Sequence, residues 1–205
     1  MNIMNTRLSS EDRERIRQSL QQKYSKVAES PEGKFRYPVG RSGLEGQKYD
    51  PEILKALPEE VLSAYCGVGN PFLLGPVHEG ESVLDIGCGA GVDTLVAALM
   101  VGPQGRVAGV DVIPEMLRRA RENLARTTIE NVEFQEASAE NLPYPGESFD
   151  IVISNGAFNL VTDKMSALSE AFRVLKPGGR FMMADQVLVS DAPVDTRSMV
   201  ESWAR

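Results

Sequence analysis

The sequence predicts an α/β fold whose β-sheet is mainly parallel. Short apolar segments alternate with amphipathic helical segments between residues 82 and 185, which is the pattern of repeated β-α units. A glycine-rich turn joins the first apolar segment to the first of these helices, and an aspartate ends the first two apolar segments or follows them closely. With 205 residues, 42% of them hydrophobic, the chain is long enough for one such domain with a substantial core.

The first 80 residues differ from the sheet-forming part. Residues 9–28 place apolar side chains at helical spacing among many charges and predict one amphipathic helix with Ser9 or Ser10 as its N-cap. Residues 30–49 are rich in Gly, Pro and charge and predict a flexible loop. Residues 50–64 predict two short helices that each begin at a proline.

We therefore expect an N-terminal extension over residues 1–49 and a ligand-binding domain over residues 50–205. Within the second part, residues 50–80 form a helical cap. The cap covers either the ligand cleft or an exposed edge of the sheet, and the sequence favours neither arrangement.

Five strands and two well-defined helices follow the cap. The predicted strands are residues 82–85, 105–110, 131–134, 148–155 and 180–185. One helix is predicted over residues 92–101, and a later one has Leu168, Ala171, Phe172 and Leu175 on one face and stops at the Lys-Pro-Gly-Gly sequence of residues 176–179.

The turn after the first strand predicts a ligand site. Residues 82–91 read SVLDIGCGAG, with glycine at every second position after Asp85. Glycine tolerates positive φ and has no Cβ, so the backbone can approach a nucleotide-like ligand closely. Dinucleotide-binding turns usually read G-x-G-x-x-G, whereas position 92 here is Val. Asp85 is also better suited to an ammonium group than to a diphosphate, because like charges repel.

These residues, with Asp111 at the end of the second strand, resemble the first motifs of the class I S-adenosylmethionine (SAM) methyltransferases, which have a Rossmann-like sheet. The resemblance implies SAM as cofactor, with Asp85 near the methionine ammonium and Asp111 on the ribose hydroxyls. It implies no catalytic side chain and no metal. The other implied cofactor contacts are Gly87, Cys88, Gly89 and Gly91 at the methionine end, Val112 and Met116 around the adenine, Ser138 and Ala139 beside the adenine amino group, and Asn155 facing the methyl group.

A narrower resemblance extends over roughly residues 50–190. Several segments are similar to the arsenite methyltransferase family, and many of them are shared with the ubiquinone and menaquinone C-methyltransferases. These segments are residues 57–61, 67–71, 109–116, 153–160 and 172–179, in addition to the glycine turn.

The cysteines depart from the arsenite methyltransferase pattern. That family holds trivalent arsenic through thiolates, which are soft ligands for a soft metalloid. Val68 and Gly156 stand where the family usually has cysteine, and residues 1–65 contain none. Of the two cysteines present, Cys66 lies near the first position and Cys88 lies inside the glycine turn. The resemblance thus implies methyl transfer to a small-molecule acceptor, with the arsenic site missing or rebuilt.

Methyl transfer from a sulfonium needs mainly alignment in a dry pocket. The sequence offers no convincing general base, because the one histidine, His78, is expected in a surface loop. This favours a soft or activated acceptor. Two other classes of protein remain open: a SAM-binding protein without catalysis, and an NAD-dependent oxidoreductase, which the glycine spacing disfavours.

Composition excludes several partners. A net charge of −7 argues against nucleic acid, whose phosphates require clustered Lys and Arg. No apolar run approaches the roughly 20 residues of a membrane span, and the charged N-terminal segment is unlike a signal peptide. Two cysteines form no disulfide framework, so we expect a cytoplasmic protein.

The C-terminus predicts an incomplete sheet. Class I methyltransferases continue after the fifth strand with a helix and a two-stranded hairpin, and this chain ends at Arg205, early in the expected helix. We therefore expect either a truncated C-terminal hairpin or self-association through the exposed edge of the fifth strand.

Overall fold

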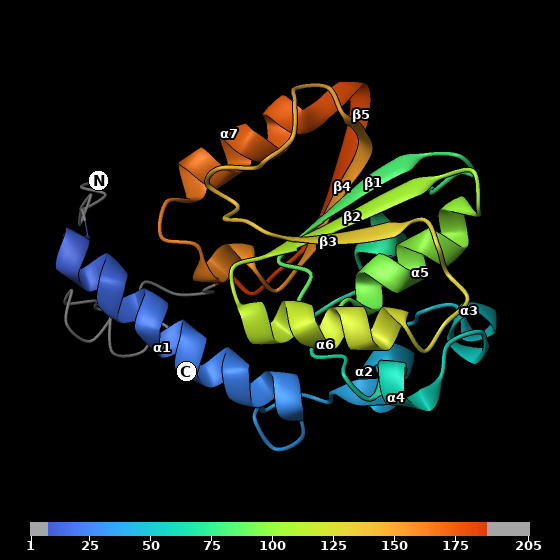
Figure 1. The fold of residues 1–205 in the computed structure, drawn as a ribbon, viewed down its shortest axis with the longest axis horizontal. Helices are drawn as coiled ribbons and strands as arrows, with labels where there is room; N and C mark the ends of the chain where they lie inside the picture. Colours follow the sequence, from blue (N-terminus) through green and yellow to red (C-terminus); the bar gives the residue numbers. More distant parts are fainter. Residues whose placement is uncertain (1–7, 188–205) are drawn as a thin grey trace.

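The computed structural model describes residues 8–187. They form three layers, with a five-stranded sheet between two layers of helices (Figure 1). The strand order is β3-β2-β1-β4-β5, and all four neighbouring pairs are parallel, which confirms the predicted sheet. The strands are β1 (Ser82–Ile86), β2 (Arg106–Asp111), β3 (Val132–Glu136), β4 (Phe149–Asn155) and β5 (Leu175–Ala184).

Helices cover both faces of the sheet. Helices α5 (Val92–Val101) and α6 (Pro114–Leu124) lie on one face, and α7 (Lys164–Val174) lies on the other (Figure 1). Because side chains alternate along a strand, Val83 packs in the core below α5, whereas Leu84 and Ile86 pack in the core below α7. Asp85 therefore faces the same side as α5.

The buried face of α7 differs from the predicted one. Ala167, Ala171 and Val174 face the sheet, whereas Phe172 is 81% exposed. The two alanines allow a close approach between helix and sheet, and their spacing with Val174 is also helical. Of the predicted apolar face, only Ala171 is fully buried.

Strand β5 begins earlier than predicted. Leu175 already pairs with Phe149, and the ladder resumes with Arg180 opposite Ile151, so residues 176–179 form an irregularity within the strand. The Lys-Pro-Gly-Gly sequence therefore ends α7 as expected, and it does so while the chain is already entering the sheet.

Helix α1 (Ser10–Glu29) confirms the predicted amphipathic helix. Ser9 is its N-cap and forms a capping box with Asp12. The helix packs along α6 (Figure 1), where Gln21 Nε2 donates a 2.7 Å hydrogen bond to Glu115 Oε2. Toward its other end, Arg13 reaches Thr162 in the segment before α7 with a 3.4 Å hydrogen bond.

The predicted loop at residues 30–49 contains a helix, α2 (Gly40–Gly46), so the prediction was wrong for these residues. Three glycines give α2 a poor intrinsic helix propensity. Tertiary contacts compensate, since Gly40 N–H donates to the Tyr65 carbonyl at 2.7 Å. The remaining short helices are α3 (Pro51–Lys55), α4 (Glu59–Leu62), η1 (Pro71–Leu74) and η2 (Phe158–Leu160).

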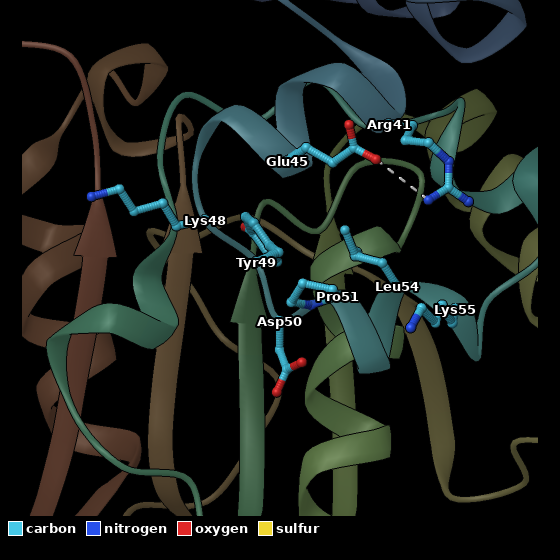
Figure 2. A pocket seen from close by; sticks show the side chains of 8 residues that line it. All are labelled: Arg41, Glu45, Lys48, Tyr49, Asp50, Pro51, Leu54 and Lys55. Carbon is cyan, nitrogen blue, oxygen red and sulfur yellow. Dashed lines mark ion pairs between the residues drawn. The ribbon is translucent and has the colours of Figure 1, made fainter.

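A pocket of about 490 Å³ opens on the outer side of this helical region, between α2 and α3 (Figure 2). Its charged residues largely pair with neighbours. Arg41 forms ion pairs with Glu45 and Glu59, and Lys55 pairs with Glu52. The ring of Tyr49 lines the pocket.

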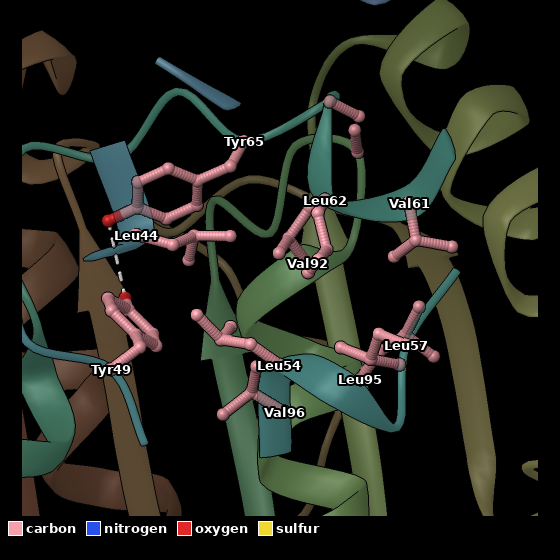
Figure 3. Close-up of a cluster of buried hydrophobic side chains, with 12 residues drawn as sticks. Leu44, Tyr49, Leu54, Leu57, Val61, Leu62, Tyr65, Val92, Leu95 and Val96 are labelled. Atoms are coloured by element: carbon pink, nitrogen blue, oxygen red, sulfur yellow. Dashed lines mark hydrogen bonds between the residues drawn. The ribbon is translucent and has the colours of Figure 1, made fainter. Parts of the chain in front are cut away.

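Helices α3 and α4 pack on α5 (Figure 3), whereas η1 of the same predicted cap contacts the edge strand β5. Their leucines and Val61 share one core with Val92, Leu95 and Val96 of α5. The segment that follows, residues 66–70, continues to the ends of β4 and β5, where Gly69 lies against Ala184. The cap thus connects the α5 face to the carboxyl ends of the strands.

Strand β5 is an edge of the sheet formed by the described residues. The predicted helix near residue 195 lies outside residues 8–187. No helix in the described part of the chain is long and apolar enough to cross a membrane.

Candidate functional site

Three acidic side chains converge near the carboxyl ends of the central strands. Asp85 lies in β1 and is 2% exposed, Asp93 lies in the first turn of α5 and is 8% exposed, and Asp111 is the last residue of β2. In an open parallel sheet this end carries the ligand-binding crevice.

The glycine turn between β1 and α5 has the tight geometry with positive φ that the sequence predicts. Gly87, Gly89 and Gly91 all have positive φ, at 74°, 52° and 81°. At Gly87 a Cβ would collide with Ala157, and at Gly91 it would lie 2.7 Å from Phe134. Side chains at these positions would therefore disturb both the turn and its packing.

Amide groups of the turn are used within the protein. The N–H groups of Gly87 and Cys88 donate to the Val110 carbonyl at 2.8 and 2.9 Å. Gly89 N–H donates to Asp111 Oδ2 at 2.8 Å. The turn can therefore present its Cα atoms and carbonyl groups to a ligand, but not these three donors. Cys88 is buried with its sulfur directed at Gly109 of β2, so it packs within the protein.

Asp111 is held by the backbone. Its Oδ2 accepts from Gly89 N–H, and its Oδ1 accepts from Ile113 N–H at 2.9 Å. Each carboxylate oxygen has a further lone pair. The side chain is thus oriented while it keeps acceptor capacity for a diol.

Met116 and Val112 have different environments. Met116 is 2% exposed and packs with Val27 and Ala28 of α1, and its methyl group lies near Gly89. Val112 is 49% exposed. Helix α1 therefore covers the β2 side of the turn, a contact that the sequence alone did not indicate.

Ser138 and Ala139 lie in the loop after β3, which the hydrogen bond from Ala137 N–H to the Asp111 carbonyl holds beside β2. The Ser138 hydroxyl accepts from Glu140 N–H at 3.2 Å, which makes it part of a local turn. Ala139 is partly buried against the α7-side core.

Asn155 ends β4, where the sequence places it, and its side chain is directed at the cap. It hydrogen-bonds the backbone of Val68 and Gly69 and the carboxylate of Asp93. It therefore connects the carboxyl end of the sheet to residues 67–69, which we call the 67–69 loop.

Sequence reasoning missed a buried polar cluster formed by Tyr49, Tyr65 and Asp93. Tyr49 OH donates to Asp93 Oδ1 at 2.5 Å and lies 3.3 Å from Tyr65 OH. All three residues come from different parts of the chain, so no local pattern groups them. The one available signal was an aspartate in the otherwise apolar helix of residues 92–101.

The electrostatics of the three acids favour a cationic ligand. Burial raises the pKa of Asp85 well above its ordinary value, and the nearby charge of Asp93 raises it further. Burial also raises the pKa of Asp93 to about 6 and the pKa of Asp111 above its usual range. Within residues 8–187, no ion pair involves any of the three. A positively charged group bound here would offset this uncompensated charge.

A parallel sheet with a glycine turn after its first strand, a buried acid near the end of β1 and a partly buried acid at the end of β2 defines a nucleoside-cofactor-binding α/β protein. Residues 77–205 match a family model described as a methyltransferase domain. The chain belongs to this methyltransferase family, which confirms the predicted resemblance.

Relatives of known name agree with this family. An arsenite methyltransferase from Halobacterium salinarum is 41% identical over 156 residues, which cover 76% of this chain and 40% of the relative. A ubiquinone/menaquinone biosynthesis C-methyltransferase from Pasteurella multocida is 43% identical over 110 residues, covering 53% of this chain and 41% of the relative. The chain thus spans about two fifths of the length of these relatives.

Solved structures show the same fold. An arsenic(III) S-adenosylmethionine methyltransferase from Chlamydomonas reinhardtii matches with a TM-score of 0.61 and 39% identity, covering 67% of this chain and 50% of that one. A SAM-dependent methyltransferase from Aquifex aeolicus matches with a TM-score of 0.53 and 26% identity, over 70% of this chain and 73% of that one.

Proposed function

We propose that this protein transfers a methyl group from SAM to a small-molecule acceptor. The observation that carries the proposal is a group of three acids around a glycine turn, none of them in an ion pair of the described chain: Asp85 and Asp93 are buried and Asp111 is partly buried. SAM carries an ammonium and a sulfonium, so it supplies the positive charge that this crevice lacks. Family membership supports the same function.

Different residues would bind different parts of the cofactor. Asp85 attracts the methionine ammonium, directly or through water, and Asp111 accepts hydrogen bonds from the ribose hydroxyls with its free lone pairs. Met116 forms the buried side of the adenine site below α1. Bound SAM supplies an electrophilic methyl group, and the protein aligns the acceptor with it and excludes water.

The acceptor side of the crevice is apolar at the two positions where cysteines are usual in the arsenite methyltransferases. A Cβ built on Gly156 would lie 3.3 Å from Val68 Cγ1, so the two positions face each other. Neither position has a thiolate to coordinate a metalloid. We therefore favour an apolar small molecule that accepts the methyl group on a carbon or sulfur atom. A quinone-type C-methyltransferase, as in the Pasteurella multocida relative, is the second candidate that this apolar wall supports.

A methyl-transfer assay tests the function. SAM labelled on its methyl group would be incubated with arsenite, with a demethylated quinone precursor and with small thiols. We expect label in the quinone precursor or in a thiol, and none in arsenite. Binding of SAM without label in any acceptor would favour a non-catalytic binding protein. Binding of NADH in place of SAM would contradict the family function.

Restoring sulfur at the two facing positions tests the acceptor site separately. We expect the double variant Val68→Cys/Gly156→Cys to bind arsenite at least tenfold more tightly than the natural chain, because two thiolates then face each other. Calorimetric titration with arsenite measures this. Gly156 has a φ of 73°, so cysteine there adds backbone strain.

The matched control for the double variant is Val68→Ser/Gly156→Ser, which has the same strain and hard donors. Equal arsenite affinity in the serine and cysteine variants would show that these positions do not face a common ligand.

A further inference from the structure

The 67–69 loop is confined on both sides. A Cβ on Gly67 would collide with the Asn155 amide and the Tyr65 hydroxyl, and one on Gly69 would lie 2.7 Å from the Ala184 Cβ. The backbone of both glycines is therefore in direct contact with the ends of β4 and β5. Val68 is the only residue of the loop that carries a side chain, and that side chain meets Gly156.

Asn155 fixes this backbone with both ends of its amide. Its Oδ1 accepts from Val68 N–H at 2.8 Å and from Gly69 N–H at 3.0 Å. Its Nδ2 donates to the Gly69 carbonyl at 2.7 Å. One side chain thus satisfies both loop N–H groups, which secondary structure leaves unpaired, and it shares the Gly69 carbonyl with the hydroxyls of Tyr65 and Tyr49.

Asp93 determines which way the Asn155 amide points. The second hydrogen of Asn155 Nδ2 goes to Asp93 Oδ2 at 3.0 Å, and Tyr49 OH holds the other carboxylate oxygen. A reversed amide would place its oxygen against the carboxylate and its N–H groups against those of Val68 and Gly69. Both contacts are repulsive, so the carboxylate selects one orientation.

We propose that Asp93 is a positioning residue for the methyl acceptor. Through Asn155 it holds the 67–69 loop, and so it fixes the wall that Val68 and Gly156 present to the acceptor. The assignment of this wall to an acceptor rests on the proposed function. The connection from Asp93 to the loop rests on the hydrogen bonds alone and can be tested without any substrate.

Amide hydrogen exchange at Val68 and Gly69 is the direct measurement. In Asn155→Asp, two carboxylates would face each other and the Gly69 carbonyl would meet a carboxylate oxygen while keeping its hydrogen bond from Tyr65 OH, so we expect exchange at both amides about tenfold faster than in the natural chain at pH 7.5. The double variant Asp93→Asn/Asn155→Asp exchanges the carboxylate and the amide between the two positions. The new amide at position 93 donates to the new carboxylate at position 155, which still accepts from both loop amides. We expect this double variant to recover most of the protection.

The rescue distinguishes a specific contact from general destabilisation. Asp93→Ala, which removes the acceptor without adding a charge, should also accelerate exchange and serves if Asn155→Asp does not fold. Unchanged protection in Asp93→Ala would overturn the proposal, and so would a double variant that exchanges as fast as Asn155→Asp.

A functional measurement follows the same variants. With the quinone precursor or thiol that the labelling assay identifies, we expect the KM for the acceptor to rise in Asn155→Asp and to fall again in the double variant, in parallel with the exchange rates. Exchange that responds as expected while KM does not change would contradict the role toward the acceptor. If no acceptor is methylated, the proposed function fails, and the exchange experiment still decides whether Asp93 holds the loop.

Discussion

Asp85→Asn is expected to weaken SAM binding by at least tenfold and to raise the melting temperature of the cofactor-free protein at pH 7.5. Both effects come from one buried charge. Asp85 is fully enclosed, its hydroxyl partner is Thr94 at 2.6 Å, and burial and the charge of Asp93 both raise its pKa. The amide removes this unfavourable charge and also removes the attraction for the ammonium.

Calorimetric titration with SAM and thermal unfolding without ligand measure the two effects. The matched control is Asp150→Asn, in the neighbouring strand β4. Partial burial opposes ionisation of Asp150, yet hydrogen bonds from Lys176 and Ser82 lower its pKa to about 2. Removing this paired charge should lower the melting temperature and leave SAM affinity unchanged.

The essential result is that the melting temperature of the cofactor-free protein rises in Asp85→Asn and falls in Asp150→Asn. If Asp85→Asn binds SAM as tightly as the natural chain does, Asp85 has no part in the cofactor site and the proposed division of the cofactor fails. If Asp85→Asn is less stable than the natural chain without ligand, the charge is stabilised by something other than the cofactor.

The cofactor-free protein is expected to become more stable as the pH falls from 7.5 to 5.5, while its affinity for SAM decreases. The pKa of Asp93 is about 6 in the folded protein, above the 3.8 of an ordinary aspartate. Between these values the folded chain retains a proton that the unfolded chain has released, so lowering the pH favours folding. For Asp93 alone the gain over this range is about 1 kcal/mol.

Thermal unfolding across this pH range would show the effect as a rise of roughly 2–4 °C. Saturation with SAM should reverse the trend, because the bound cation favours the ionised acids. Asp93→Asn provides the control and should reduce the dependence in the cofactor-free protein, while burial still raises the pKa of Asp85 and of Asp111. A melting temperature that falls steadily from pH 7.5 to 5.5 in the natural chain would mean that these acids do not dominate its titration.

The centre of the sheet could be predicted because β1, β2 and β4 are buried along most of their length and therefore read as largely apolar segments. Helix α5 was predicted to the residue, and the bounds of β1 and β2 to within one. The glycine turn could be located for a similar reason, since positive φ at three alternate positions requires glycine. Both features depend on the residues within one short segment, so they can be predicted from the sequence of that segment.

Other features depend on contacts between distant segments. Helix α2 has little propensity of its own and forms because Tyr65 accepts its first amide. The α7 face was misassigned because two helical faces were compatible with the spacing, and only the sheet selects the one with small residues. Asp93 became recognisable as a site residue only when Tyr49 and Asn155 were seen beside it.

The two glycines of the 67–69 loop have an evolutionary consequence. Neither position tolerates a larger residue, because Asn155 and Ala184 occupy the space that a side chain would need. In this segment we therefore expect substitutions mainly at position 68 and at position 156 opposite it. Neither residue shares a hydrogen bond with Asp111 in the described chain. A lineage could therefore exchange one acceptor chemistry for another by replacing two amino acids, and its inherited machinery for the methyl donor would stay intact.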